Sequence, residues 1–128
     1  MGTAFGLGKI KQISITVKDV ARASDFYRNK LGMTHLFSTP NMAFFDSGGI
    51  RLMLSIAEKP EFDHPSSILY FEVEDIQGAF AVLKERDVVF EGDPHLVAKM
   101  EDHDLWLAFF RDSEHNLLAL ASEVREPK

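Results

Sequence analysis

The chain has 128 residues, 45% of them hydrophobic and 27% charged, which is typical of one folded domain and excludes a disordered chain. Its formal net charge of −6 argues against binding to nucleic acid or to anionic membranes, which requires clustered Lys and Arg. The sequence contains no cysteine, and this excludes disulfides, thiolate metal sites and cysteine nucleophiles.

The first ten residues, MGTAFGLGKI, contain neither a basic segment nor a long apolar run. We therefore expect no signal peptide. No stretch approaches 18 consecutive apolar residues, so we expect no membrane span either. Together these features predict a cytoplasmic protein.

The first half of the chain predicts a strand, a helix and three further strands. Residues 9–17 alternate between polar and apolar side chains, as a half-buried strand does. Asp19 is a good N-cap for a helix over residues 20–31, which Gly32 ends. Three short strands separated by turn residues follow, at 34–39, 42–46 and 50–56.

The second half repeats this order after a polar, proline-containing linker at residues 57–66. A strand that begins at Ser67 leads to a second N-cap, Asp75, and to a helix over residues 76–86. Three more strands are predicted at 94–100, 105–112 and 116–122.

The two halves resemble each other residue by residue. VKDV at 17–20 corresponds to VEDI at 73–76, and the same interval separates Asp46 from Met53 as separates Asp112 from Ala119. We therefore predict an α+β fold in which two βαβββ repeats form a curved mixed sheet around a cleft. The expected organisation is a single domain over 1–128, with repeat one at 9–56, the linker at 57–66 and repeat two at 67–123.

Two segments carry a family resemblance. Residues 13–33, ISITVKDVARASDFYRNKLGM, resemble the opening signature of the vicinal oxygen chelate superfamily, and residues 109–120, FFRDSEHNLLAL, its closing signature. This superfamily includes glyoxalase I, fosfomycin-resistance thiol transferases, extradiol dioxygenases, methylmalonyl-CoA epimerase and bleomycin-binding proteins. The resemblance extends over residues 9–123 and implies the fold rather than one activity, because the scaffold hosts many chemistries. It also implies a homodimer, often with a pocket completed by both chains.

The resemblance implies metal ligands on the first and last strand of each repeat. Carried over by motif, these positions hold Gln12, Met53, Ile68 and Ala119. A hard or borderline divalent cation needs imidazole or carboxylate ligands, and of these four residues only Gln12 offers an oxygen. We therefore predict no metal cofactor at these positions. The alternative is a divalent metal recruited through the histidines.

Strand alternation extends the expected cleft from these positions, because every second side chain faces the same side. Ser14 then accompanies Gln12, Arg51 accompanies Met53, and Tyr70 and Glu72 accompany Ile68. The simpler interpretation of Arg51 is an exposed arginine at the start of a strand. The expected ligand-binding residues are Gln12, Ser14, Arg51, Met53, Tyr70, Trp106 and Ala119.

Three side chains are candidates for acid–base catalysis. Glu72 lies in an apolar strand, where a carboxylate can act as a base, although a solvated Glu at a strand end is equally compatible. His95 and His103 belong to a predicted hairpin near the cleft mouth, and imidazole suits proton transfer near neutral pH. Simple solvation of the hairpin accounts for these two histidines equally well.

The sequence thus predicts a small-molecule-binding protein of the glyoxalase and bleomycin-resistance type. It would lack the usual family metal site, and would act by sequestering a ligand or by metal-independent chemistry. The alternative is a lyase, isomerase or dioxygenase-type enzyme that uses a divalent metal recruited through histidines. A subunit-interaction domain without a ligand is a third possibility. The expected partners are a small molecule and a second copy of the chain.

Overall fold

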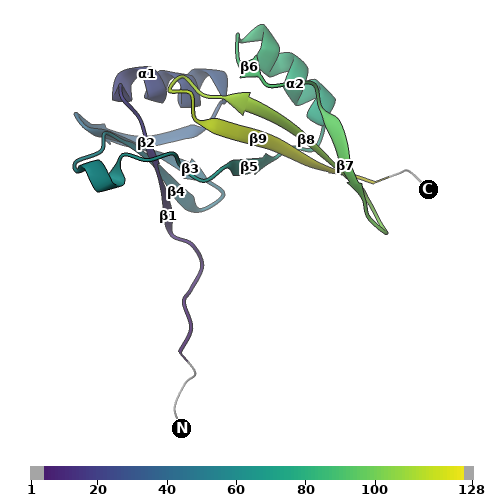
Figure 1. Ribbon diagram of the computed structural model, residues 1–128, viewed down its shortest axis with the longest axis horizontal. Coiled ribbons are helices and arrows are strands. Elements are labelled where there is room, and N and C mark those ends of the chain that lie inside the picture. Colours follow the sequence, from purple (N-terminus) through teal and green to yellow (C-terminus); the bar gives the residue numbers. More distant parts are fainter. Residues whose placement is uncertain (1–4, 126–128) are drawn as a thin grey trace.

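The computed structural model describes residues 5–125 (Figure 1). The first half contains one helical segment and four strands: β1 (Gln12–Thr16), α1 (Val20–Asp25), η1 (Phe26–Lys30), β2 (Thr34–Thr39), β3 (Met42–Ser47) and β4 (Ile50–Ser55). A short 3-10 turn, η2 (Pro60–Phe62), lies in the connection to the second half. The second half contains β5 (Leu69–Glu72), α2 (Ile76–Glu85), β6 (Val89–Phe90), β7 (His95–Lys99), β8 (Asp104–Arg111) and β9 (Leu117–Val124).

Each half builds its own sheet. The first sheet, sheet A, has the strand order β1-β4-β3-β2, and the second, sheet B, has the order β5-β9-β8-β6 with β7 also paired to β8. In both sheets the first strand runs parallel to the last strand of the same half, and the other pairs are antiparallel. The α+β class is thereby confirmed. The strands form two sheets rather than one continuous curved sheet, and α1 and α2 lie along the same side of the molecule (Figure 1).

The two helices begin alike and end differently. Asp19 and Asp75 each accept a hydrogen bond from the backbone N–H three residues on, at 3.0 Å in both cases. A Cβ on Gly78 would lie 2.5 Å from an oxygen of the Asp75 carboxylate, so a larger residue there would force that side chain to shift. The helix expected over 20–31 changes to a π-helical turn from Phe26, which sequence periodicity does not reveal because the residue spacing changes by less than one position.

The hydrophobic core lies between the helices and one face of each sheet. Alternation along β1 and β4 sends Ile15, Leu52 and Leu54 into this core, and alternation along β8 and β9 sends Phe110 and Leu118 there. All five belong to a single cluster of buried residues drawn from both halves. Among residues 5–125, neither α1 nor α2 covers the other face of either sheet.

The turn between β8 and β9 joins the two halves through Asp112, which is 5% exposed. Its carboxylate accepts a hydrogen bond from the Tyr27 hydroxyl at 2.7 Å and from the Asn116 side chain at 3.0 Å. Asn116 in turn donates to the Thr16 backbone oxygen at 3.2 Å. Burial and the neighbouring carboxylate raise the pKa of Tyr27 well above 10.0, so the hydroxyl stays a donor at any physiological pH.

Glu114, in the same turn, binds the beginning of α1. Its carboxylate accepts from the backbone N–H groups of Lys18 at 2.9 Å and Asp19 at 3.2 Å. It also forms a two-pronged ion pair with Arg22, at 2.7 and 2.9 Å, and is 1% exposed. The Arg22 hydrogen bonds, followed by the backbone donors, lower the pKa of Glu114 from 4.5 to about 2.

Within residues 5–125, no helix is long and apolar enough to span a bilayer.

The depressed pKa of Glu114 predicts an acid-dependent stability. The contribution of this carboxylate to the free energy of unfolding is complete above pH 4.5 and disappears as the pH falls towards about 2. Glu114→Gln should lower stability at neutral pH by roughly 2 kcal/mol and flatten this acid slope. Urea midpoints between pH 7 and pH 2 measure both effects. Glu91→Gln is the control, because Glu91 forms only an exposed pair with Arg111 at 3.5 Å. Equal acid slopes for wild type and Glu114→Gln would contradict the prediction.

Candidate functional site

The open face of sheet A carries four of the residues expected to bind a ligand. Gln12 pairs with Arg51 and Ser14 pairs with Met53 across the parallel strands β1 and β4. All four side chains lie opposite the buried ones, such as Leu52. The structure therefore brings these predicted residues together on one surface.

Arg51 is held in place on this surface. Its Nε donates to Gln12 Oε1 at 2.7 Å, and its guanidinium lies 5.5 Å from the centre of the Phe44 ring. The Gln12 amide nitrogen lies 3.8 Å from the Met53 sulfur. Phe37 stacks on Phe44 with 4.4 Å between ring centres. The result is a positively charged, planar group on an aromatic base.

A cavity of about 370 Å³ lies beside these residues, between sheet A and the linker. Ser14 and Met53 form part of its floor, while Phe62 and His64 of the linker form part of its wall. The linker is attached to the sheet by a hydrogen bond from Thr16 Oγ1 to the Phe62 backbone oxygen, at 3.0 Å. This cavity is lined by sheet A and linker residues.

The open face of sheet B carries an aromatic surface formed by Tyr70, His95 and Phe109. Ala119 pairs with Tyr70 on one side and with Phe109 on the other. The Tyr70 and Phe109 rings meet edge to face at 6.0 Å between centres, and His95 stacks on Phe109 at 6.2 Å. Ala119 is completely buried, whereas Tyr70 is 52% exposed. The aromatic surface therefore presents rings to solvent at the place where the family resemblance implies a metal ligand.

Glu72 and His95 lie in one row across sheet B. Between them are Ala121 and Leu107, which pair with Glu72 and His95 respectively and with each other. Three strand spacings separate Glu72 from His95, or about 14 Å. Both side chains are solvent-accessible, and they are too far apart to exchange a proton directly. They could act only on different parts of one bound molecule.

His103 lies at the far end of the same face, in a surface network of charges. Its Nδ1 is 2.7 Å from Asp102, its Nε2 is 3.9 Å from Glu123, and Arg125 lies 3.7 Å from both carboxylates. The hydrogen bond from His103 lowers the pKa of Asp102. Glu123 is four residues along β9 from Ala119, so His103 is separated from the aromatic surface by roughly 13 Å of strand.

Trp106 does not lie with the other expected ligand-binding residues. It pairs with Ser122, which is buried, and packs against the core cluster. Trp106 and Phe109 are three positions apart, an odd number, so the two rings face opposite sides of β8. The expectation that Trp106 lines the cleft is therefore wrong: it faces the helix side of sheet B.

The expected ligand-binding residues did not include the two phenylalanines that support the candidate surfaces. Phe44 pairs with Met53, and Phe109 pairs with Ala119, so both share a face with a motif-placed residue. Once the strand register is known, a residue placed by the family motif also fixes the face on which its paired residue lies. Both phenylalanines could then have been found. Antiparallel register in these strands depends on the hairpin turns, and the sequence alone left it open.

The four positions at which the resemblance implies metal ligands do not fit a divalent cation. The only oxygen among them, Gln12 Oε1, already accepts from Arg51, whose positive charge would repel a metal ion. Met53 supplies a thioether, Ala119 is covered by rings, and Ile68 is a hydrocarbon. In the described part of the chain, no three His, Cys, Asp or Glu side chains are grouped as metal ligands would be.

Comparison with known proteins gives relatives over almost the whole chain. An uncharacterised protein of Bacillus subtilis (strain 168), YraH, is 30% identical over 129 aligned residues, covering 88% of this chain and 96% of YraH. Among solved structures, lactoylglutathione lyase from Agrobacterium tumefaciens has a TM-score of 0.72 at 15% identity, covering 91% of this chain and 94% of the lyase. The fosfomycin resistance protein FosX from Listeria monocytogenes has a TM-score of 0.73 at 15% identity, with the same coverage, 91% and 94%.

These structural likenesses establish the fold. The family follows from the sequence, because the family profile described as Glyoxalase/Bleomycin resistance protein/Dioxygenase superfamily matches residues 9–120. The chain belongs to the Glyoxalase/Bleomycin resistance protein/Dioxygenase superfamily.

Proposed function

We propose that this protein binds a small, planar and largely apolar molecule on the aromatic surface of sheet B, without a metal at the family ligand positions. The main support for the proposal is Ala119, which occupies a position where the family resemblance implies a metal ligand. Ala119 is buried beneath the rings of Tyr70 and Phe109. Exposed aromatic rings around a small residue offer a flat apolar platform. Stacking on such rings stabilises a planar ligand by about 1–3 kcal/mol.

Sheet A would supply the polar contacts that orient the ligand. Arg51 is immobilised by Gln12 and Phe44, so it can pair with a carboxylate of the ligand at little entropic cost. Ser14 provides a hydroxyl beside Ser55, at 3.4 Å, and Met53 provides an adaptable apolar contact. We therefore propose an aromatic carboxylate as the class of ligand.

Binding alone, or binding followed by metal-independent chemistry, is compatible with these groups. Glu72 lies beside the aromatic surface, in one row with His95 of that surface, so each could transfer a proton to or from a different end of the ligand. His103 would act only on a ligand that extends well beyond the rings. An enzyme that recruits a metal through histidines is less well supported, since no grouping of metal-ligating side chains occurs among residues 5–125.

We also propose a homodimer in which the open face of sheet A in one copy lies opposite the open face of sheet B in the other. Apolar side chains on these two faces are exposed: Phe37 by 49% on sheet A and Tyr70 by 52% on sheet B. Exposed apolar groups in such density favour contact with another protein surface. Two-fold pairing would bring Arg51 and Tyr70 of different copies to the same ligand.

Tyr70→Ala should weaken the binding of a planar aromatic carboxylate, with 2-naphthoate as the first probe. Loss of the stacking ring should raise the dissociation constant about tenfold. The melting temperature should change little, because Tyr70 is 52% exposed. Val89→Ala is the control, since Val89 is 63% exposed and lies on β6, outside this surface. Equal affinities for the two variants in a calorimetric titration would rule out the aromatic surface.

Mixed dimers test whether two copies share a site. The homodimers of the Arg51→Glu chain and of the Tyr70→Ala chain should each bind 2-naphthoate weakly. The two chains are co-expressed with different tags, and the mixed dimer is isolated. It should bind one 2-naphthoate per dimer with wild-type affinity, because one of its two sites combines an unaltered sheet A face with an unaltered sheet B face. A mixed dimer no better than its parents, or a monomer by light scattering at micromolar concentration, would contradict the proposal.

Elemental analysis tests the metal prediction. The purified protein should contain far less than one Ni, Zn, Mn or Fe per chain, and chelators should leave its melting temperature unchanged. The physical reason is that the Gln12 side-chain oxygen already accepts a hydrogen bond from Arg51 and is not free to bind a metal. Stoichiometric metal lost on Gln12→Ala would show that the amide is a ligand after all.

A further inference from the structure

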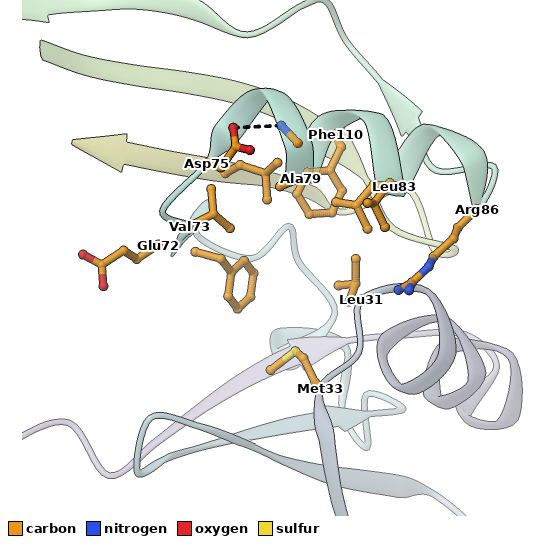
Figure 2. A pocket seen from close by; sticks show the side chains of 13 residues that line it. Leu31, Met33, Glu72, Val73, Asp75, Ala79, Leu83, Arg86 and Phe110 are labelled. Atoms are coloured by element: carbon orange, nitrogen blue, oxygen red, sulfur yellow. Dashed lines mark hydrogen bonds between the residues drawn. The ribbon is translucent and has the colours of Figure 1, made fainter. Parts of the chain in front are cut away.

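A second cavity, of about 520 Å³, lies on the opposite side of sheet B from the aromatic surface. Figure 2 shows it between α2 and the segment after η1. Phe71 and Leu120 contribute to its floor, and they alternate along their strands with Tyr70 and Ala119 of the open face. The thickness of the sheet therefore separates this cavity from the ligand site proposed above.

The walls of this cavity are apolar. On α2, Ala79, Val82 and Leu83 recur at helical spacing and form one stripe that faces the cavity. Leu31 and Met33 face the stripe from the other half of the chain, on either side of Gly32, where the backbone turns with a φ of +72°. Val82 is 44% exposed. Apolar side chains are thus exposed to solvent inside this cavity, and its volume is in the usual range of small-molecule sites.

Arg86 continues the stripe and supplies the charge at one end. It follows Val82 by one helical turn, and Figure 2 shows its guanidinium directed towards the Leu31 side of the cavity. One nitrogen, Nη1, donates to the Lys30 backbone oxygen at 2.8 Å, which fixes the side chain. Among the ion pairs of residues 5–125, none involves Arg86, so its remaining N–H groups are available to an anion.

The carboxylates at the other end do not offset this charge inside the cavity. The Glu72 carboxylate points away from Leu31, Met33 and Leu83 in Figure 2. The Asp75 carboxylate accepts the backbone N–H of Gly78 at 3.0 Å and serves as the α2 cap. The cavity therefore presents a hydrocarbon surface that ends in a single oriented cation.

We infer that this cavity binds a single-chain anionic amphiphile, such as a medium-chain carboxylate, with its hydrocarbon chain along the α2 stripe and its carboxylate on Arg86. The rise of a helix from Ala79 to Arg86 is roughly 10 Å, which suits a chain of about ten carbons. Burial of the chain supplies the affinity, and the guanidinium selects the head group because it pairs with a carboxylate through two parallel hydrogen bonds.

The test compares three probes that share a ten-carbon chain: decanoate, decanol and decyltrimethylammonium, each below its micelle-forming concentration. Isothermal titration of the full chain should show one decanoate per chain, bound at least tenfold more tightly than decanol, and no binding of the ammonium probe. Arg86→Gln should remove this head-group preference by weakening decanoate about tenfold while leaving decanol unchanged. A purely structural role for Arg86 would weaken both probes equally and would overturn the inference.

Two further variants locate the bound chain. Ala79→Leu fills the cavity from α2 and should abolish decanoate binding without loss of stability, because the added methyl groups occupy open space. Val82→Phe serves the same purpose from the rim if Ala79→Leu fails to fold. Tyr70→Ala is the matched control: it should leave decanoate affinity unchanged while it weakens 2-naphthoate. If Tyr70→Ala abolishes decanoate binding and the two cavity variants do not, the amphiphile binds the open face of sheet B and the inference is wrong.

Discussion

The hydrogen-bonded docking of the β8–β9 turn onto the start of α1 is the interaction on which the rest of the structure depends. Each half of the chain alone has about 50 residues, a size at which the buried core gives only marginal stability. Asp112 and Glu114 place two carboxylates against Tyr27, Arg22 and the backbone at the start of α1. Both carboxylates are almost fully enclosed, so losing either set of partners would leave a buried charge unpaired.

The two repeats share the same order of strands and helix, but they differ in the docking contacts of the turn before the last strand. Counting from Met53 and Ala119 as matching positions, Gly48 stands in the first repeat where Glu114 stands in the second, and Asp46 is exposed where Asp112 is buried. Only the second-repeat turn thus carries the groups that join the halves. The second-repeat turn thus adds polar contacts to the hydrophobic core that the two halves share.

Alternation along a single strand gives sheet B two different surfaces. Tyr70 faces the open side with Phe109, whereas Phe71 faces the helix side and the cavity that ends at Arg86. On sheet A the same rule places Arg51 and Gln12 together, where their ion–dipole contact removes the one oxygen a metal could have used. The proposed ligand chemistry follows from side chains that the strand period of two puts on one face.

The sequence by itself determined the local features of this protein: the two repeats and the helix caps Asp19 and Asp75. These depend on short-range periodicity and on hydrogen bonds within a few residues, which a pattern encodes directly. Only the tertiary structure decided that Trp106 turns towards the core, because its strand had no anchored neighbour until β8 was paired with β9. The division into two sheets and the cavity beside α2 likewise arise from contacts between segments more than forty residues apart, such as Arg86 with Lys30, and no local pattern records such distances.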